Sequence, residues 1–416
     1  MKIGFARRDI TPPLGLELGG YAGYRPCSDV HDPLYCKVIL LEQENRRYAL
    51  VMLDLMCADE SLWQKIACAI SDLGICRQNL IVAAIHSHAA PAGVVPKEGP
   101  LAQVNDPIVP QNPVFTEYMQ TVVRMAADAC RQASEELEHF RVRTARRPMP
   151  PIGSERHSGE PAHGDLTVVQ FRTESGKNVI LYNIPCHPTV LSAANLSVSA
   201  DFAGCVEDLL DADMAVFVNG AAGDISTRFT RRGSTFEECG RLGGMVAQQI
   251  RQMLEDTNFV DPEPLRGIHT TVRLQARQVS TVEAAQEQLE QTTARWQQAV
   301  SSGADAATVR ILKSYVEGAG VNLEFAATMV GMTEFEVPVT VFRFAGVPFV
   351  SIPGEFYSTL LPPQTAAICY ANGYYRYIAD TNAYDTGHYE ALAAIVARGG
   401  GEQLGNTIRQ LLDRLK

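Results

Sequence analysis

The sequence lacks the features that mark membrane and secreted proteins. Its longest apolar runs, "YALVMLDLMCA" and "LIVAAI", have the length of strands, whereas a membrane-spanning helix needs roughly 18 to 20 apolar residues. The amino-terminal stretch "MKIGFARRDITPP" contains no apolar segment of signal-peptide length. We therefore predict a cytoplasmic protein without a transmembrane segment.

Basic residues and paired cysteines are also scarce. Lysine and arginine number 36 against 47 aspartates and glutamates, and the net charge of −11 argues against nucleic acid as a partner, because phosphate binding depends on basic patches. None of the ten cysteines forms a C-x-x-C pair, which argues against a zinc knuckle or a thioredoxin-like motif. We expect mostly buried free thiols rather than a disulfide framework.

What the sequence does contain is a long alternation of strand-like and helix-like segments over its first half. Such alternation predicts an α/β fold, a layered domain with a mixed, largely parallel sheet flanked by helices. Near residue 280 the composition shifts to Gln, Glu and Ala, and a capping box from Ser280 to Glu283 opens the first of two helices. We predict a helical hairpin insertion over 281–319, and further helices near 356–367 and 386–398.

Candidate ligands follow several of the predicted strands. The strand in "LIVAAIHSHAAPAG" ends on His86 and His88, which face the same side of an extended chain. His187 follows "LYNIPC", and Glu355 lies in "SIPGEFY". Ligands far apart in the sequence, each at a strand end, are typical of catalytic zinc sites. Each histidine can equally be a hydrogen-bonded residue at the rim of a sheet, and the pattern alone leaves both interpretations open.

Five stretches in order along the chain carry a family resemblance. They are "GFARRDITPPLGLELGGYA", "IHSHAAPAG", "IPCHPTVL", "NGAAGDIS", and "IPGEF" followed by "CYANGYYRYIADTNAYDTGHYEA". Together they resemble the neutral/alkaline (non-lysosomal) ceramidase family, specifically its zinc-bearing amino-terminal domain. The resemblance spans residues 3–391 and so implies a single ceramidase-like catalytic domain over 1–416, with the hairpin 281–319 inside it.

The resemblance implies one zinc ion per chain. Matching the motifs residue by residue implies four metal ligands, which are His86, His187, Glu355 and Tyr377. Such a set leaves room for a water ligand, as a catalytic zinc requires. The resemblance also implies three residues around the scissile bond, which are His88, Tyr389 and, through "SERHS", Arg156.

These residues have expected roles. A metal-bound water attacks the amide carbonyl, Arg156 and Tyr389 stabilise the oxyanion, and His88 relays a proton to the leaving amine. Ser226, in "GDIST", corresponds to a serine sometimes considered a nucleophile in the family. Because the metal already supplies a nucleophile, we favour a structural or substrate-positioning role for Ser226, such as a helix cap.

Other polar residues near these motifs have less defined roles. Asp201 is a candidate acceptor for the second N–H of a metal-bound imidazole. Asp54 is either a turn cap or a wall of the site. We expect the remaining tyrosines of the carboxyl-terminal segment to pack rather than to bind metal, namely Tyr370, Tyr374, Tyr375 and Tyr384.

The sequence therefore predicts a zinc-dependent hydrolase that cleaves an N-acyl (amide) bond in a small-molecule or lipid-like substrate. Two alternatives stay open: a zinc esterase or phosphoesterase that uses the same water, and a non-catalytic binding protein with a structural metal. The acyl group, the amine and a homo-oligomeric state are left undetermined. The hairpin could be a lid, a dimer contact or a surface elaboration.

Overall fold

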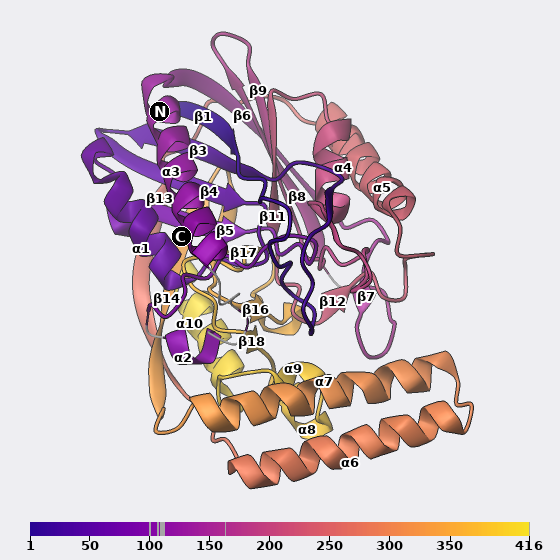
Figure 1. The fold of residues 1–416 in the computed structure, drawn as a ribbon. Coiled ribbons are helices and arrows are strands. Elements are labelled where there is room, and N and C mark those ends of the chain that lie inside the picture. Colours follow the sequence, from indigo (N-terminus) through magenta and orange to yellow (C-terminus); the bar gives the residue numbers. More distant parts are fainter. Residues whose placement is uncertain (100, 106–107, 109–112, 163, 416) are drawn as a thin grey trace.

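The computed structural model describes residues 1–416 apart from 100, 106–107, 109–112, 163 and 416 (Figure 1). Its strands are β1 (Lys2–Asp9), β2 (Asp29–Val30), β3 (Tyr35–Gln43), β4 (Arg46–Leu53), β5 (Leu80–Ala84), β6 (Glu138–Pro148), β7 (Ser154–Glu155), β8 (Asp165–Thr173), β9 (Asn178–Ile184), β10 (Ser197–Val198), β11 (Met214–Asn219), β12 (Ile225–Ser226), β13 (Arg266–Gln275), β14 (Glu334–Phe344), β15 (Val347–Ser351), β16 (Glu355–Phe356), β17 (Ala366–Ile368) and β18 (Tyr377–Ile378). Its α-helices are α1 (Glu60–Ala69), α2 (Ala102–Asn105), α3 (Pro113–Glu135), α4 (Asp201–Leu209), α5 (Phe236–Glu255), α6 (Val282–Ser301), α7 (Ala306–Thr328), α8 (Thr381–Thr386), α9 (Tyr389–Leu392) and α10 (Gly400–Asp413).

A large mixed sheet forms the centre of the molecule, and the predicted α/β class is confirmed. Within the described residues its strand order is β11-β9-β8-β6-β1-β3-β4-β5. Parallel pairing is limited to the two ends of this sheet, at β11–β9 and β4–β5, and the pairs between them are antiparallel. The antiparallel pairing of β3 with β4 has a local cause. Glu44 and Asn45 both have positive φ and form the tight turn that joins these two strands.

A second sheet, of order β13-β14-β15-β17, lies against one face of the large sheet. Phe342 and Phe349 of this sheet and Leu41 of the large sheet line a common cavity between the two. Helices cover the opposite face of the large sheet, where α3 packs on β1 and β3, and α4 and α5 pack on β11 and β6. The carboxyl-terminal α10 packs on the outer side of β13 and β14. The fold is therefore layered as helices, sheet, sheet and helix.

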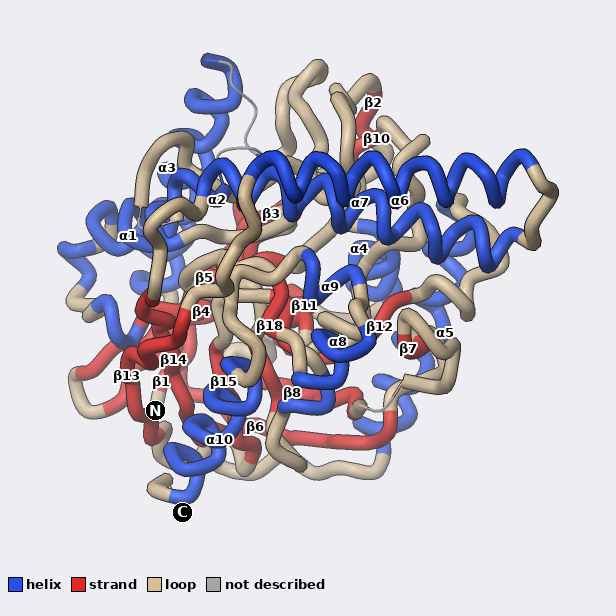
Figure 2. Tube along the Cα trace, turned by 90° about the horizontal axis from the view of Figure 1, so that it is seen from below, coloured by secondary structure: helices blue, strands red, loops and turns tan. Residues whose placement is uncertain are grey.

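The predicted helical hairpin corresponds to α6 and α7, which lie side by side along one edge of the molecule (Figures 1 and 2). Helix α7 continues to Thr328, beyond the expected end at 319, and packs against α9. None of the helices in the described ranges combines the length and the apolar composition that crossing a bilayer requires.

The prediction of helices near 356–367 and 386–398 is wrong. The first region contains a single 3-10 turn, Ser358–Leu360, followed by β17. Pro362 and Pro363 cannot continue a helix, and the chain after them pairs with β15 instead. In the second region only the short α9 forms, and Ala394 and Val396 make isolated bridges to Arg376 and Ala276, each of which adjoins a strand.

A buried ion-pair triad ties α4 to the large sheet and explains Asp54. Lys37 of β3, which is 2% exposed, donates to both carboxylate oxygens of Asp54 at 2.9 Å and contacts Glu207 of α4 at 2.6 Å. Asp54 also accepts the backbone N–H of Tyr35. Although burial disfavours its charge, the two carboxylates raise the pKa of Lys37. Asp54 therefore acts in the core as the partner of Lys37.

Removing one member of this triad should destabilise the fold strongly. We expect Lys37→Met to lower the free energy of unfolding by about 3 kcal/mol, because it leaves two buried carboxylates without a cation. Urea denaturation measures this change. The control is Lys65→Met, which removes an exposed pair with Glu98 and should change the free energy by less than about 1 kcal/mol. Equal effects of the two substitutions would show that the triad is not a structural tie.

Candidate functional site

The candidate site lies where several strands end on the same side of the molecule. His86 follows β5, His187 follows β9, and the turn at 220–224 follows β11. The short strand β16 pairs in parallel with β18, so that Glu355 is directly opposite Tyr377. An isolated bridge joins His187 to Ser226. The expectation that strand ends bring these distant motifs together is thus met by the geometry.

Three candidate ligands converge in this position. His187 Nε2 lies 3.0 Å from Glu355 Oε2, and His86 Nε2 lies 3.4 Å from the same oxygen. All three side chains are buried: His187 is 1% exposed, His86 is 2% exposed and Glu355 is 3% exposed. Their ligand atoms all lie within 4.8 Å of one another, close enough to hold one metal ion.

Hydrogen bonds from the Nδ1 atoms of both imidazole rings fix the orientation of the rings, so that Nε2 faces the centre. His86 Nδ1 lies 2.7 Å from the carbonyl oxygen of Met56, and His187 Nδ1 lies 2.9 Å from that of Ile225. A carbonyl only accepts hydrogen bonds, so each Nδ1 carries the proton and donates it. Each Nε2 then points toward the Glu355 carboxylate, and this arrangement requires a cation between the acceptor atoms, either a second ring proton or a metal ion.

Burial favours the metal over the proton at His187. Burial lowers the pKa of His187 to about 4, so at neutral pH the ring is uncharged and its Nε2 lone pair is available to a metal. Burial opposes the charge of Glu355, but the adjacent histidines outweigh it and hold the pKa of this carboxyl well below its usual value. The centre therefore offers the neutral imidazole of His187, the imidazole of His86 and one carboxylate.

Two tyrosines expected only to pack contribute directly to this centre. Tyr374 donates its hydroxyl to Glu355 Oε1 at 2.7 Å, and the ring of Tyr370 stacks on His86 with centroids 4.0 Å apart. Both side chains are buried, and these contacts do not contradict the expectation that they pack rather than bind metal. Tyr375 and Tyr384 instead donate to the backbone carbonyls of Glu336 and Val396. The crowding of tyrosines in "CYANGYYRY" is the sequence signal that could have indicated such contacts.

The second-sphere role expected for Asp201 is wrong, because the imidazole N–H groups donate to backbone carbonyls. Asp201 instead accepts the backbone N–H groups of Val190, Leu191 and Phe202. This carboxylate thus fixes the loop that follows His187 at the start of α4. Burial raises the pKa of Asp201 to about 6.

A second charged group adjoins the three ligands. Arg156 donates to the Tyr377 hydroxyl at 2.9 Å and pairs with Glu390 at 3.1 Å. Burial opposes the charge of Arg156, but Tyr377 and Glu390 raise its pKa well above the usual value. Burial also raises the pKa of Tyr377, so this residue is a neutral phenol. Sequence reasoning named Arg156 and Tyr377 but missed Glu390, whose carboxylate holds the arginine in place.

His88 and Tyr389 lie on either side of this region. His88 Nε2 is 3.3 Å from His86 Nε2, and burial lowers the pKa of His88 well below its usual value. Its Nδ1 is buried and has no hydrogen-bond partner within the described part of the chain. The Tyr389 ring packs edge-on against Tyr377 with centroids 5.7 Å apart. Both residues are thus adjacent to candidate ligands.

Two glycines make the close packing of the site possible. Gly223, in the turn after β11, approaches β16 so closely that a Cβ would lie 2.6 Å from the Glu355 carbonyl oxygen. Gly20 has φ +87°, and a Cβ there would lie 2.3 Å from Cγ of His88. The "GGYA" and "GAAGD" motifs therefore have a steric role beside the site.

Ser226 lies in the two-residue strand β12 and does not cap a helix as suggested. Its hydroxyl oxygen is 3.4 Å from the backbone nitrogen of Arg228. Within the described residues, no histidine or carboxylate accepts a hydrogen bond from this hydroxyl. A nucleophilic serine requires such a base, and the geometry gives Ser226 no means of activation.

A further group of possible ligands comprises His157, His388 and Glu390. The two imidazoles stack with centroids 3.6 Å apart, and His157 Nε2 lies 2.7 Å from Glu390 Oε2. The other carboxylate oxygen is occupied by Arg156. A metal here would stand beside a guanidinium, so this group is less suited to a cation than His86, His187 and Glu355.

The buried charge of Glu390 should make the fold sensitive to acid. Burial opposes ionisation, but Arg156 and His157 lower the pKa of Glu390 to about 2. Because this lies below the unfolded value of about 4.3, the stabilisation is complete above that pH and is lost as the pH falls toward 2. We expect Glu390→Gln to lower the free energy of unfolding at pH 7 by about 3 kcal/mol and to flatten its decline in acid.

Denaturant titrations at a series of pH values measure both effects. The control is Glu136→Gln, which removes an exposed carboxylate paired with Lys177. If the Glu390 variant kept the pH dependence of the unsubstituted protein, the proposed ionised state of Glu390 would be wrong.

Comparison with known proteins places this geometry in a known fold. No protein-family model matches the chain, and no curated protein matches it in sequence. Among solved structures, neutral ceramidase from Pseudomonas aeruginosa aligns with a TM-score of 0.75 and 14% identity, over 99% of this chain and 73% of that one. A ceramidase complexed with C2 aligns with a TM-score of 0.73 and 14% identity, over 100% of this chain and 75% of that one. The chain therefore has the fold of the neutral ceramidases over nearly its whole length.

Proposed function

We propose that the protein is a zinc-dependent amidohydrolase that cleaves a linear N-acyl amide. One observation carries the proposal: His86, His187 and Glu355 bring three ligand atoms together in a buried centre, with a charged arginine next to it. The shared fold with solved ceramidases supports the same reaction class.

The residues fit a zinc ion in number and kind. His86, His187 and Glu355 would hold the metal, and Tyr377, opposite Glu355 in the β16–β18 pair, is the proposed fourth protein ligand. Two imidazoles and a carboxylate are a known catalytic zinc set. We propose one ion per chain. When bound there, zinc supplies Lewis-acid chemistry, which makes water a nucleophile near neutral pH and polarises a carbonyl.

The surrounding residues would bind and orient the scissile amide. Arg156 is held by Glu390 with its guanidinium directed at the Tyr377 hydroxyl, so it can stabilise negative charge that develops on the carbonyl oxygen. Tyr389 is a neutral phenol because burial raises its pKa, and it can donate to the same oxygen. Neither group needs to reorganise, because packing already fixes both.

His88 is the proposed proton carrier. Its low pKa keeps the ring neutral, and a neutral imidazole can accept a proton at one nitrogen while it donates from the other. Its Nε2 faces the centre, 3.3 Å from His86 Nε2, and is the atom proposed to exchange a proton with the leaving amine. Ser226, which has no base, is proposed to position the substrate rather than to attack it.

Zinc content and substrate preference test the proposal. We expect purified protein to carry about one zinc per chain, to hydrolyse N-acyl amides such as ceramide, and to lose activity with a chelator and regain it with zinc. His187→Ala should lose zinc and turnover while its thermal melt stays cooperative. His139→Ala, an exposed histidine of β6, is the control.

Three results would contradict the proposal in different ways. Protein that carries no zinc and gains no activity from added zinc would exclude the metal. Turnover of esters or phosphates without turnover of amides would change the reaction class. Collapse of the fold in His187→Ala would indicate a structural metal.

The role of His88 can be tested without replacing it. We expect Gly20→Ala to displace the His88 ring and to lower kcat by at least about tenfold, because general acid–base catalysis contributes 10²- to 10⁴-fold, while zinc content stays the same. Gly23→Ala is a matched control, since Gly23 also has positive φ but a Cβ there would meet no atom within 4 Å. Steady-state kinetics and metal analysis distinguish them. Equal losses in both variants would attribute the effect to backbone strain and not to His88.

A further inference from the structure

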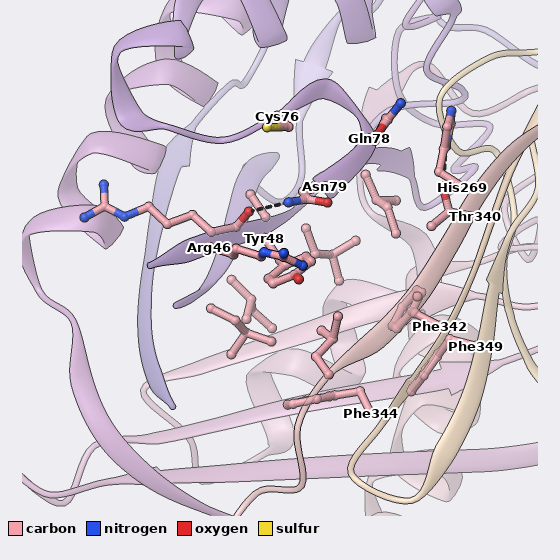
Figure 3. Close-up of a pocket in the computed structure, with 18 of the residues that line it drawn as sticks. Arg46, Tyr48, Cys76, Gln78, Asn79, His269, Thr340, Phe342, Phe344 and Phe349 are labelled. Carbon is pink, nitrogen blue, oxygen red and sulfur yellow. Dashed lines mark hydrogen bonds between the residues drawn. The ribbon is translucent and has the colours of Figure 1, made fainter. Parts of the chain in front are cut away.

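A cavity of about 460 Å³ lies between the two sheets, away from the candidate site. Its floor comes from alternate residues of the large sheet, including Leu41, Leu50 and Leu181. Its roof comes from phenylalanines of the second sheet, Phe342 and Phe349 (Figure 3). The lining residues lie near the starts of β4 and β5, whereas His86 follows the end of β5. The cavity and the candidate site share no lining residue or ligand.

The two faces of the large sheet differ in how completely they are filled. Leu41 and Ile81 face the cavity and are 7% and 8% exposed, whereas Leu40 and Val82, which point to the other face beneath the helices, are 0% exposed. An apolar void between packed sheets costs folding free energy in proportion to its volume. The volume also falls within the range of small-molecule binding pockets, which is about 300 to 1,000 Å³. An apolar ligand would remove this cost.

The mouth of the cavity carries a cation. Arg46, at the start of β4, lies beside Tyr48 among the lining side chains, whereas the adjacent Arg47 is held by Glu42 and Ser134 (Figure 3). No hydrogen bond or ion pair to the Arg46 guanidinium is found within the described ranges of the chain. A guanidinium matches a carboxylate through two parallel hydrogen bonds. The combination of an apolar gap and one available guanidinium at its entrance fits an amphiphile with a single anionic head.

We propose that this cavity binds a long-chain carboxylate, with the apolar chain between the sheets and the carboxylate at Arg46. The site is separate from the proposed hydrolytic centre and does not depend on it. A carboxylate fits better than a larger anionic head, because only one arginine at the mouth is without a partner in the described residues. The neighbouring polar groups at the rim, Gln78 and Asn79, are uncharged and leave Arg46 as the anchor.

Titration calorimetry with dodecanoate and with dodecanol tests both parts of the site. We expect one dodecanoate to bind per chain, about tenfold more tightly than dodecanol, because the alcohol lacks the charged hydrogen bonds to Arg46. Arg46→Gln should weaken dodecanoate binding about tenfold and leave dodecanol binding unchanged. Arg295→Gln, an exposed arginine of α6, is the matched control and should change neither.

Filling the cavity tests whether the apolar chain of the ligand lies between the two sheets. Leu50→Trp, or Leu50→Phe if the tryptophan variant does not melt cooperatively, should abolish binding of both probes. Absence of dodecanoate binding, or binding that survives both Arg46→Gln and the filled variant, would overturn the proposal. A dimer in sedimentation that the filled variant dissociates, without any dodecanoate binding, would also overturn it and would indicate a second copy of the chain as the occupant.

Discussion

The arrangement of the candidate site depends on one electrostatic constraint, the convergence of three acceptor atoms in a place without solvent. His86 Nε2, His187 Nε2 and Glu355 Oε2 face one another because the carbonyls of Met56 and Ile225 occupy the outer nitrogens. Such an arrangement is stable only when a cation is shared. The strand ends and the Tyr374 hydroxyl hold the three groups in place against their mutual repulsion.

The same constraint accounts for the ion pair beside the centre. An arginine next to a cation site would oppose metal binding if its charge were not balanced. Glu390 supplies this balance, because it is buried, ionised and in contact with Arg156 at 3.1 Å. The guanidinium can therefore lie close enough to act on a substrate carbonyl without displacing a metal. Because Glu390 is already engaged by Arg156 and His157, it is also poorly placed to be a ligand itself.

How much of this could be predicted from the sequence depends on how local the cause is. The approach of His86, His187 and Glu355 follows from strand ends, and strand patterns are local. The contacts of Tyr374 and Glu390 are not local, because each depends on the packing of a carboxyl-terminal segment with no regular periodicity. The large sheet is mixed, with its parallel pairs at the two ends, and the strands of the second sheet take up a face that helices would otherwise cover. Pro362 and Pro363, by contrast, were a local signal against the helix predicted there.

The two proposed binding regions use opposite ends of the same strands, and their chemistry differs accordingly. The starts of β4 and β5 border the apolar cavity. The ligand proposed for this cavity has a long apolar chain and an anionic head. The residues after β5 and β9 carry imidazoles, whose outer nitrogens donate to the buried carbonyls of Met56 and Ile225 so that the inner nitrogens suit a cation. A long-chain carboxylate is also the acid product that hydrolysis of a lipid amide would release. If both proposals hold, the molecule binds one class of acyl chain at two chemically distinct places, one reactive and one not, and substitutions in either region can be read separately because no side chain is common to both.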